Sequence, residues 1–284
     1  MANYIKLLLA IVMLSTISLI TFPTDKLQAK DKKLKYKENS VLALNYHRIR
    51  NDNFLDDFLY TFSNSKEMSA YSINKSQFES QIKWLKEHDA NFITQKELIK
   101  YKEKGDFPQN SVWVNFDDMD ESIYRNAHPI LEKYNVPATG FVITGEIGSR
   151  DFHNLNILHK KELQKMKDSD LWEFQSHTHN LHTLEDDKSL LIKASDKALT
   201  KDIKQSNHYL KSQLDEKNDS IAYPYGQIES EKIEPLKKGG IRYGYTLEEK
   251  VIEPDDHDYY MPRILINEES FNKLIKNWKG FKDE

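Results

Sequence analysis

Cysteine is absent from the 284 residues of this chain, and its absence excludes two kinds of chemistry. Without thiols there is no cysteine nucleophile and no zinc site built from thiolates. Small exported domains usually need disulfides, but a chain of this length can bury enough core to fold without them. Internal repeats and low-complexity tracts are also missing. The length allows one large domain or two small ones, and we expect one.

The chain also has no excess of positive charge. The formal net charge is −4, and the first 29 residues carry Lys6, Lys26 and Asp25, so the rest of the chain has a net charge of −5. We therefore expect no nucleic-acid partner. The locally basic stretch 30–37 begins a segment, 30–40, that we interpret as a solvated linker. The alternative is that it touches an anionic cell wall or membrane surface.

Long hydrophobic runs are limited to the N-terminus. An apolar stretch, 7–22, follows Lys6 and precedes Leu27-Gln28-Ala29, where a small residue stands at a candidate cleavage point. The stretch is shorter than the roughly 20 residues that a spanning helix needs. It predicts a secretory signal peptide over 1–29 and hence a secreted, extracellular and cell-surface-associated protein. A permanent membrane anchor is the alternative.

Strand and helix patterns alternate along the rest of the chain. Such alternation is typical of a parallel sheet or barrel wrapped by helices, so the fold class is α/β. A stretch without clear periodicity, 51–72, is predicted to be a surface loop. The expected strands are 41–47, 91–94, 112–116, 138–144, 172–175, 221–223, 243–246 and 264–266, and the expected helices are 76–88, 95–104, 122–134, 160–168, 195–214, 229–239 and 270–278.

Two polar clusters follow apolar strands. Asp117 and Asp118 come at the end of the expected strand 112–116, and two adjacent carboxylates repel each other unless a cation or a proton relieves them. A histidine cluster, 177–182, follows the expected strand 172–175. Imidazoles with a carboxylate are a typical zinc-binding set. Because chemistry in such folds gathers at the carboxyl ends of strands, the sequence predicts a metal-dependent hydrolase.

These clusters also carry a family resemblance. Asn115-Phe116-Asp117-Asp118, His177-Thr178-His179-Asn180-Leu181-His182 and Ala222-Tyr223-Pro224-Tyr225-Gly226 occur in the order and rough spacing of the polysaccharide deacetylase family, carbohydrate esterase family four. Leu44–Ile49 and Met261–Ile264 resemble the branch that deacetylates poly-β-1,6-N-acetyl-D-glucosamine. The resemblance spans about 41–276. It implies a deacetylase domain over 41–284 with a single (β/α) barrel-like fold, a distorted or incomplete TIM-type barrel.

The resemblance implies roles for the clustered residues. Asp117 would be the general base, and Asp118, His177 and His182 would be the metal ligands. Another pairing, such as His179 with His182, stays open, because ligands five residues apart require a loop that folds back on itself. A helix cap or a turn is the alternative role for the aspartates.

The remaining site candidates are single residues. His47 would be the general acid, with a structural histidine as the alternative. The backbone N–H of Tyr225 would help to stabilise an oxyanion. The family commonly has an arginine in the 222–226 motif, which this chain lacks, and Arg263 would replace it from another strand unless it forms an ordinary surface ion pair. Trp172 and Trp278 could stack on sugar, but buried packing is the preferred interpretation.

The resemblance implies a hydrolase that releases acetate from an extracellular N-acetylglucosamine polysaccharide and makes a biofilm polymer partly cationic. We expect a monomer with one divalent metal, zinc first, although cobalt, nickel or iron would suit the same ligands. Two alternatives stay open: a peptidoglycan or chitin-type deacetylase, and a non-catalytic glycan-binding surface protein.

Overall fold

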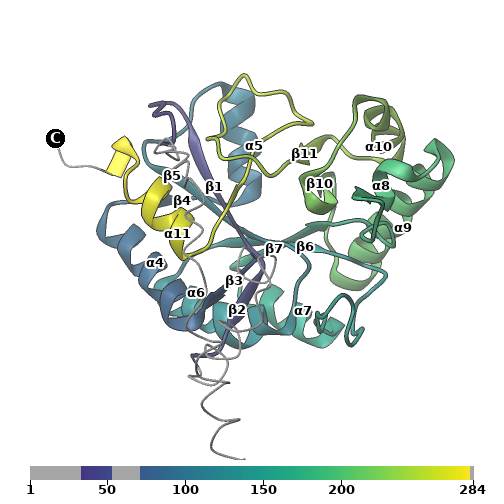
Figure 1. Ribbon diagram of the computed structural model, residues 1–284, viewed down its shortest axis with the longest axis horizontal. Coiled ribbons are helices and arrows are strands. Elements are labelled where there is room, and N and C mark those ends of the chain that lie inside the picture. The colour runs from purple at the N-terminus through teal and green to yellow at the C-terminus, as the bar shows by residue number, and fades with distance from the viewer. Residues whose placement is uncertain (1–32, 53–70, 282–284) are drawn as a thin grey trace, which may run out of the picture. The chain divides into compact units, whose positions relative to one another are not determined.

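Parallel strands form the centre of the fold (Figure 1). The computed structural model describes residues 33–52 and 71–281, and they belong to one unit, Lys33–Glu284. Every side chain is buried in β1 (Val41–Tyr46), β5 (Ser111–Phe116), β6 (Ala138–Val142) and β7 (Trp172–Ser176). Burial on both faces is typical of parallel strands enclosed by helices.

The strands follow one another around a curved sheet. Their order is β11 (Tyr243–Tyr245), β10 (Ser220–Ala222), β7, β6, β5, β1 and β12 (Ile264–Leu265), and β4 (Asn91–Phe92) pairs with β5 beside this path. A single parallel bridge between Tyr245 and Met261 connects the segment before β12 to β11. One C-terminal segment therefore contacts both ends of the sheet. The prediction of an incomplete (β/α) barrel is confirmed.

Helices surround these strands (Figure 1). Side-chain caps mark some of the helix starts: Thr94 accepts a hydrogen bond from the Glu97 amide at α5, and Ser195 accepts one from the Ala198 amide at α9. The apolar side of α9 packs inward through Leu199, Ile203, Leu210 and Leu214. The α-helices are α4 (Lys75–Glu87), α5 (Gln95–Lys104), α6 (His128–Tyr134), α7 (Lys160–Lys167), α8 (Leu190–Lys193), α9 (Asp196–Leu214), α10 (Ile233–Gly239) and α11 (Glu268–Ser270).

Three predicted helices are not continuous α-helices. The predicted helix 122–134 starts with a π-helical turn, Ile123–Ala127, and Pro129 offers no N–H for a regular bond to the carbonyl four residues earlier. The predicted helix 229–239 becomes α-helical only at Ile233, so that Pro235 lies in the first turn, where proline is tolerated. The predicted helix 270–278 is a π-helical turn, Phe271–Ile275, after α11.

Four short strands were not predicted. β2 (Arg48–Arg50) pairs in parallel with β3 (Ser72–Asn74), and β8 (Leu184–Glu185) forms a hairpin with β9 (Lys188–Ser189). All four are only two or three residues long, too short for alternation to show in the sequence. Most of the predicted loop 51–72 and the whole predicted signal peptide, 1–29, lie outside the described residues.

Part of the predicted linker 30–40 packs against the domain, while most of its other described residues are exposed. Leu34 is buried, and the ring of Tyr36 lies 5.4 Å from that of Trp278. The Asn39 side chain hydrogen-bonds Gly105 O and the Phe107 amide. Apolar residues at 34 and 36 alternate with lysines, so one side of the segment can pack while the lysines remain near water.

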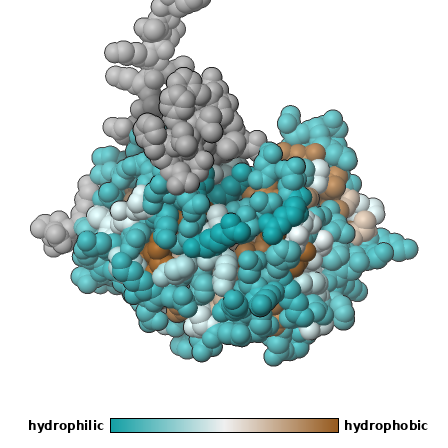
Figure 2. Space-filling view, turned by 90° about the horizontal axis from the view of Figure 1, so that it is seen from below, coloured by the Kyte–Doolittle hydropathy of each residue, from teal (hydrophilic) through white to brown (hydrophobic). Residues whose placement is uncertain are grey.

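The outer surface of the described part is mainly polar. On the face drawn in Figure 2, hydrophilic residues predominate and hydrophobic areas are small. Leu184 is the one exposed large hydrophobic side chain among the described residues. No helix in that part of the chain combines the length and apolar character needed to cross a bilayer.

Candidate metal and catalytic site

Strand pairing brings the predicted site residues to one end of the barrel. β1 and β5 pair in register up to Tyr46 and Phe116, and the Asp117 amide then donates to Tyr46 O. His47 and Asp117 therefore leave neighbouring strands side by side. The amide of His177 donates to Val142 O, which places the histidine loop, 177–182, directly after β7.

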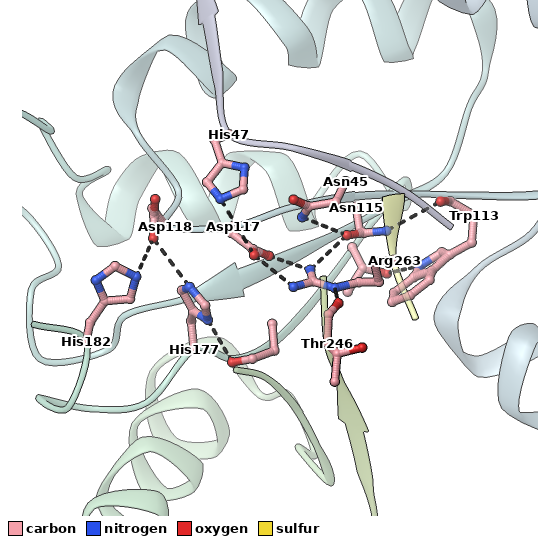
Figure 3. Close-up of polar contacts among 12 residues, drawn as sticks. Asn45, His47, Trp113, Asn115, Asp117, Asp118, His177, His182, Thr246 and Arg263 are labelled. Carbon is pink, nitrogen blue, oxygen red and sulfur yellow. Dashed lines mark hydrogen bonds and ion pairs between the residues drawn. The ribbon is translucent and has the colours of Figure 1, made fainter. Parts of the chain in front are cut away.

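Asp118, His177 and His182 converge (Figure 3). Asp118 Oδ1 lies 3.4 Å from His177 Nε2 and 3.0 Å from His182 Nε2. One candidate ligand atom from each residue lies within 4.8 Å of the other two, and all three residues are buried. Two imidazoles and one carboxylate are a set that binds zinc in hydrolases, with positions left for water and substrate.

The hydrogen bonds of His177 favour a cation at this point. His177 Nδ1 lies 2.8 Å from Ala222 O, and a carbonyl can only accept, so Nδ1 carries the proton. In neutral His177 the Nε2 lone pair then faces the Asp118 carboxylate, an arrangement that needs a metal or a second proton between them. Asp118 Oδ1 and His182 Nδ1 are buried without a hydrogen-bond partner among the described residues. The three side chains therefore fit a divalent metal.

The charges of Asp118 and His177 agree with this role. Burial by itself would raise the pKa of Asp118, but the contacts with His182 and His177 hold it well below its usual range. Burial also acts to lower the pKa of His177, and Asp117 and Asp118 outweigh it and raise that pKa. Asp118 is thus an ionised oxygen ligand at neutral pH, in a pocket that attracts positive charge.

Asp117 is held from behind by Arg263. Arg263 Nη1 lies 2.6 Å from Asp117 Oδ1 and Nη2 lies 2.9 Å from Oδ2, a bidentate pair with both side chains buried (Figure 3). Asn115 Oδ1 and Thr246 O accept further bonds from the guanidinium. The alternative of a surface ion pair is therefore wrong. The planar donor fork of arginine fixes both oxygens of one carboxylate.

The arginine also keeps Asp117 charged. Burial alone would raise the pKa of Asp117, but the charges of Arg263 and His177 and the Arg263 hydrogen bonds bring it below its usual range. His47 Nε2 lies 3.8 Å from Asp117 Oδ2, and the ring edge of His47 contacts Tyr71. Burial, together with the charges of Arg263 and His177, lowers the pKa of His47 although Asp117 and Asp118 act to raise it.

A cavity of about 350 Å³ opens beside these residues. Tyr225 lies in its wall with its ring 5.0 Å from that of His182. The residues that line the cavity are His47, Arg48, Tyr71, Asp118, His153, Asn154, Leu155, His177, His182, Leu184 and Tyr225.

Other sequence candidates lie elsewhere. His179 Nδ1 hydrogen-bonds Thr144 Oγ1 at 3.0 Å, and this histidine is not part of the cluster of candidate ligands. Trp172 and Trp278 are buried among other aromatic rings, so the preferred interpretation, packing, is confirmed.

Sequence reasoning missed the polar residues behind the site. Asn45 and Asn115 are fully buried, and Asn45 Nδ2 donates to Asn115 Oδ1, which also accepts from Arg263. A polar residue inside each of two apolar strands was the available signal, because a buried amide needs partners. The cavity residues His153 and Asn154 lie in a turn and Leu184 lies in the two-residue strand β8, so none of them gave a comparable signal.

Several site residues have a left-handed backbone. Asp118, Met119, Thr178 and Tyr225 have φ values of 65°, 62°, 73° and 57°. This conformation is unusual for residues other than glycine, and most of all for a β-branched one such as Thr178. Such strain persists only where surrounding contacts fix the backbone, and it concentrates at functional sites.

Together, the barrel and the cluster at its strand ends define a hydrolase with a candidate metal site. The family model described as polysaccharide deacetylase matches residues 104–244. A poly-β-1,6-N-acetyl-D-glucosamine N-deacetylase of Staphylococcus aureus is 57% identical over 256 residues, which cover 89% of this chain and 88% of that protein. A protein of the same name from Staphylococcus epidermidis is 54% identical over 90% and 89%. The chain belongs to the polysaccharide deacetylase family.

Solved structures agree with this fold. IcaB from Ammonifex degensii aligns with a TM-score of 0.72 and 25% identity, over 85% of this chain and 96% of that one. The Streptococcus pyogenes deacetylase PplD, in complex with acetate, aligns with a TM-score of 0.68 and 27% identity, over 81% and 93%.

Proposed function

We propose that this chain is a secreted, metal-dependent hydrolase that removes N-acetyl groups from poly-β-1,6-N-acetyl-D-glucosamine. The main support is the convergence of Asp118, His177 and His182 beside Asp117, in a cavity whose wall includes His47. The substrate follows from the relatives of that name, with 54% and 57% identity over most of the chain.

The reaction joins a water oxygen to the acetyl carbon and breaks the bond from that carbon to the amide nitrogen. Acetate leaves, and the sugar keeps a free amine. Asp117 accepts the proton of the attacking water, because its low pKa keeps it ionised and Arg263 fixes its orientation. A divalent ion held by Asp118, His177 and His182 would lower the pKa of water and polarise the acetamide carbonyl.

The leaving nitrogen needs a proton, and His47 is the proposed donor. Its Nε2 lies 3.8 Å from Asp117 Oδ2, so the base and the acid face the same reacting group. The Tyr225 backbone N–H is proposed to donate to the oxygen on which negative charge develops. Each turnover converts a neutral sugar into a cationic one at neutral pH, which would let the polymer adhere to anionic surfaces.

The proposed metal is zinc, since two imidazoles and a carboxylate suit it, with cobalt, nickel or iron as substitutes. We further propose that residues 1–29 are a signal peptide that directs export, and that the protein is a monomer. The polar outer surface, with Leu184 as the exposed large hydrophobic among the described residues, supports a monomer.

The test is acetate release from β-1,6-linked N-acetylglucosamine oligomers, with and without a chelator. We expect release that stops on thorough metal removal and returns with added zinc. Chitin oligomers and peptidoglycan serve as alternative substrates, and faster release from either would move the assignment to the second kind of deacetylase. Activity that survives full metal removal would contradict the mechanism.

Asp117→Asn separates catalysis from glycan binding. The hydrolase proposal predicts near-complete loss of acetate release with zinc binding retained, since Asp118 and both histidines are unchanged. A non-catalytic glycan-binding protein would keep its function in this variant. Asp151→Asn is the matched control, because Asp151 is exposed and its left-handed backbone also suits asparagine.

A further inference from the structure

The loop that carries both candidate histidine ligands has an unfavourable backbone conformation. It leaves β7 at Ser176 and places Thr178 at φ 73°, which a β-branched residue rarely adopts. This turn points His177 and His182 toward the same oxygen of Asp118. Strain of this kind persists only where surrounding contacts hold the backbone.

Residues 144 and 145 hold the loop from one side, through bonds to Thr178 O, His179 O and the His179 ring, and α9 holds it from the other. Asp202 Oδ1 accepts the backbone N–H of His179 and Oδ2 accepts that of Asn180, both at 2.8 Å. One helical turn further on, the Ser206 hydroxyl lies 2.8 Å from that of Ser176, which accepts the Thr178 amide. Residues four apart on a helix share one face, so α9 presents both groups to the loop.

Asp202 is buried, with 6% of its surface exposed, and its two carboxylate oxygens each accept one loop amide. Two successive amides around one anionic group form a backbone nest. An asparagine in this place would offer one acceptor oxygen and would point an N–H₂ group at the second amide. The contact therefore requires a carboxylate.

We propose that Asp202 is a positioning residue for the metal site: its carboxylate fixes the 177–182 loop in the ligand-presenting conformation before a metal binds. Partners behind metal ligands typically change metal affinity by about 10–100-fold when they are replaced. Asp202 touches neither metal nor substrate, so it acts on affinity rather than on the chemical step. The inference rests on the proposed metal-dependent function.

The test compares zinc affinity of the full chain and of Asp202→Asn, measured by competition with a fluorescent chelator. We expect zinc to bind the variant about 10–100-fold more weakly, with activity regained when zinc is saturating. Asp196→Asn, an exposed position in the first turn of α9, should bind like the wild type. Unchanged affinity in Asp202→Asn together with a lower melting temperature would overturn the proposal in favour of a merely structural role.

A second measurement needs no variant. In the metal-free wild type, the amides of His179 and Asn180 should be protected from hydrogen exchange, because Asp202 already holds them. Rapid exchange of both amides would overturn the proposal even if Asp202→Asn fails to fold. If the wild type itself binds no divalent ion, it is the proposed function that fails, while protected amides would still show the Asp202 contact.

Discussion

Asp117 and Arg263 form a bidentate ion pair that fixes the position of both side chains in the site. Both side chains are buried, and the guanidinium also bonds Asn115 and Thr246. A buried charge whose partner is removed costs about 3–5 kcal/mol, since water cannot replace the partner. Arg263 thus supports folding as well as the orientation of the Asp117 carboxylate.

Replacing Arg263 by methionine should therefore destabilise the protein by about 3–5 kcal/mol near pH 7, measured by urea unfolding. In the wild type the pKa of Asp117 lies below the unfolded value of 3.8, so the stability from this pair is present above that value and is lost as pH falls through the folded pKa. In the variant the buried carboxylate loses its partner and its pKa rises, so the penalty should shrink on acidification.

Arg242→Met is the control for this substitution. Arg242 forms ion pairs with Glu103 and Asp219 at the surface, with 62% of its side chain exposed. Its loss should cost less than about 1 kcal/mol. Equal destabilisation by the two substitutions would contradict the importance assigned to the buried pair.

Local sequence signals were sufficient for some site residues and not for others. Asp117 and Asp118 stand out because two carboxylates follow a strand that is otherwise apolar. The burial of Arg263 could not be predicted, because the strand order that brings it to Asp117 is a tertiary property. Asp202 had no signal at all, since one aspartate on an amphipathic helix is ordinarily solvated.

At the scale of elements, the strongest signals gave the best boundaries. The helix predicted over 195–214 is α9, Asp196–Leu214, because Ser195 is a typical N-cap and apolar residues recur at helical spacing. The strand predicted over 112–116 is β5 with one residue added. The π-helical turns and the short strands depend on tertiary contacts, and local periodicity does not encode them.

The loop at Gly145 and the histidine loop, 177–182, are in close contact beside the candidate metal site. The Gly145 amide donates to His179 O, and a Cβ at position 145 would collide with that carbonyl and with the Asn180 side chain. Gly145→Ala should therefore move the histidine loop, with an overpacking cost of about 1–3 kcal/mol. We expect weaker zinc binding together with a lower melting temperature.

Gly105→Ala distinguishes a loss of stability from a loss of the site. Gly105 caps α5 at φ 75°, and a Cβ added there would meet no atom within 4 Å, so alanine adds backbone strain alone. It should lower the melting temperature and leave zinc affinity unchanged. The expectation for Gly145 would be wrong if both variants bound zinc as the wild type does.

At the scale of the whole barrel, the C-terminal segment 261–265 connects the two edges of the sheet. Ile264 and Leu265 pair with β1, Met261 bridges to β11, and Arg263 lies between them. A chain that stops at residue 260 should lack cooperative thermal unfolding, because the edge of β1 and the Asp117 carboxylate lose their partners. A chain that stops at residue 281 retains every described element and should unfold like the full chain; identical melting curves for both would contradict this role.

The overall fold class followed from alternation alone, whereas the closing of the sheet did not. β12 is two residues long, and nothing in Ile264-Leu265 specifies that it should lie beside β1. That position depends on the hydrogen bonds of neighbouring segments, such as the one from the Ile266 amide to Asn45 O. Long-range pairing of this kind is set by the completed core.

The late place of Arg263 in the chain also orders events in time. Asp117 meets its guanidinium partner across 146 residues of sequence, so a chain whose C-terminal part has not yet folded leaves this buried carboxylate without a partner. We therefore expect acetate release only after β12 has docked, and none from a product that lacks it.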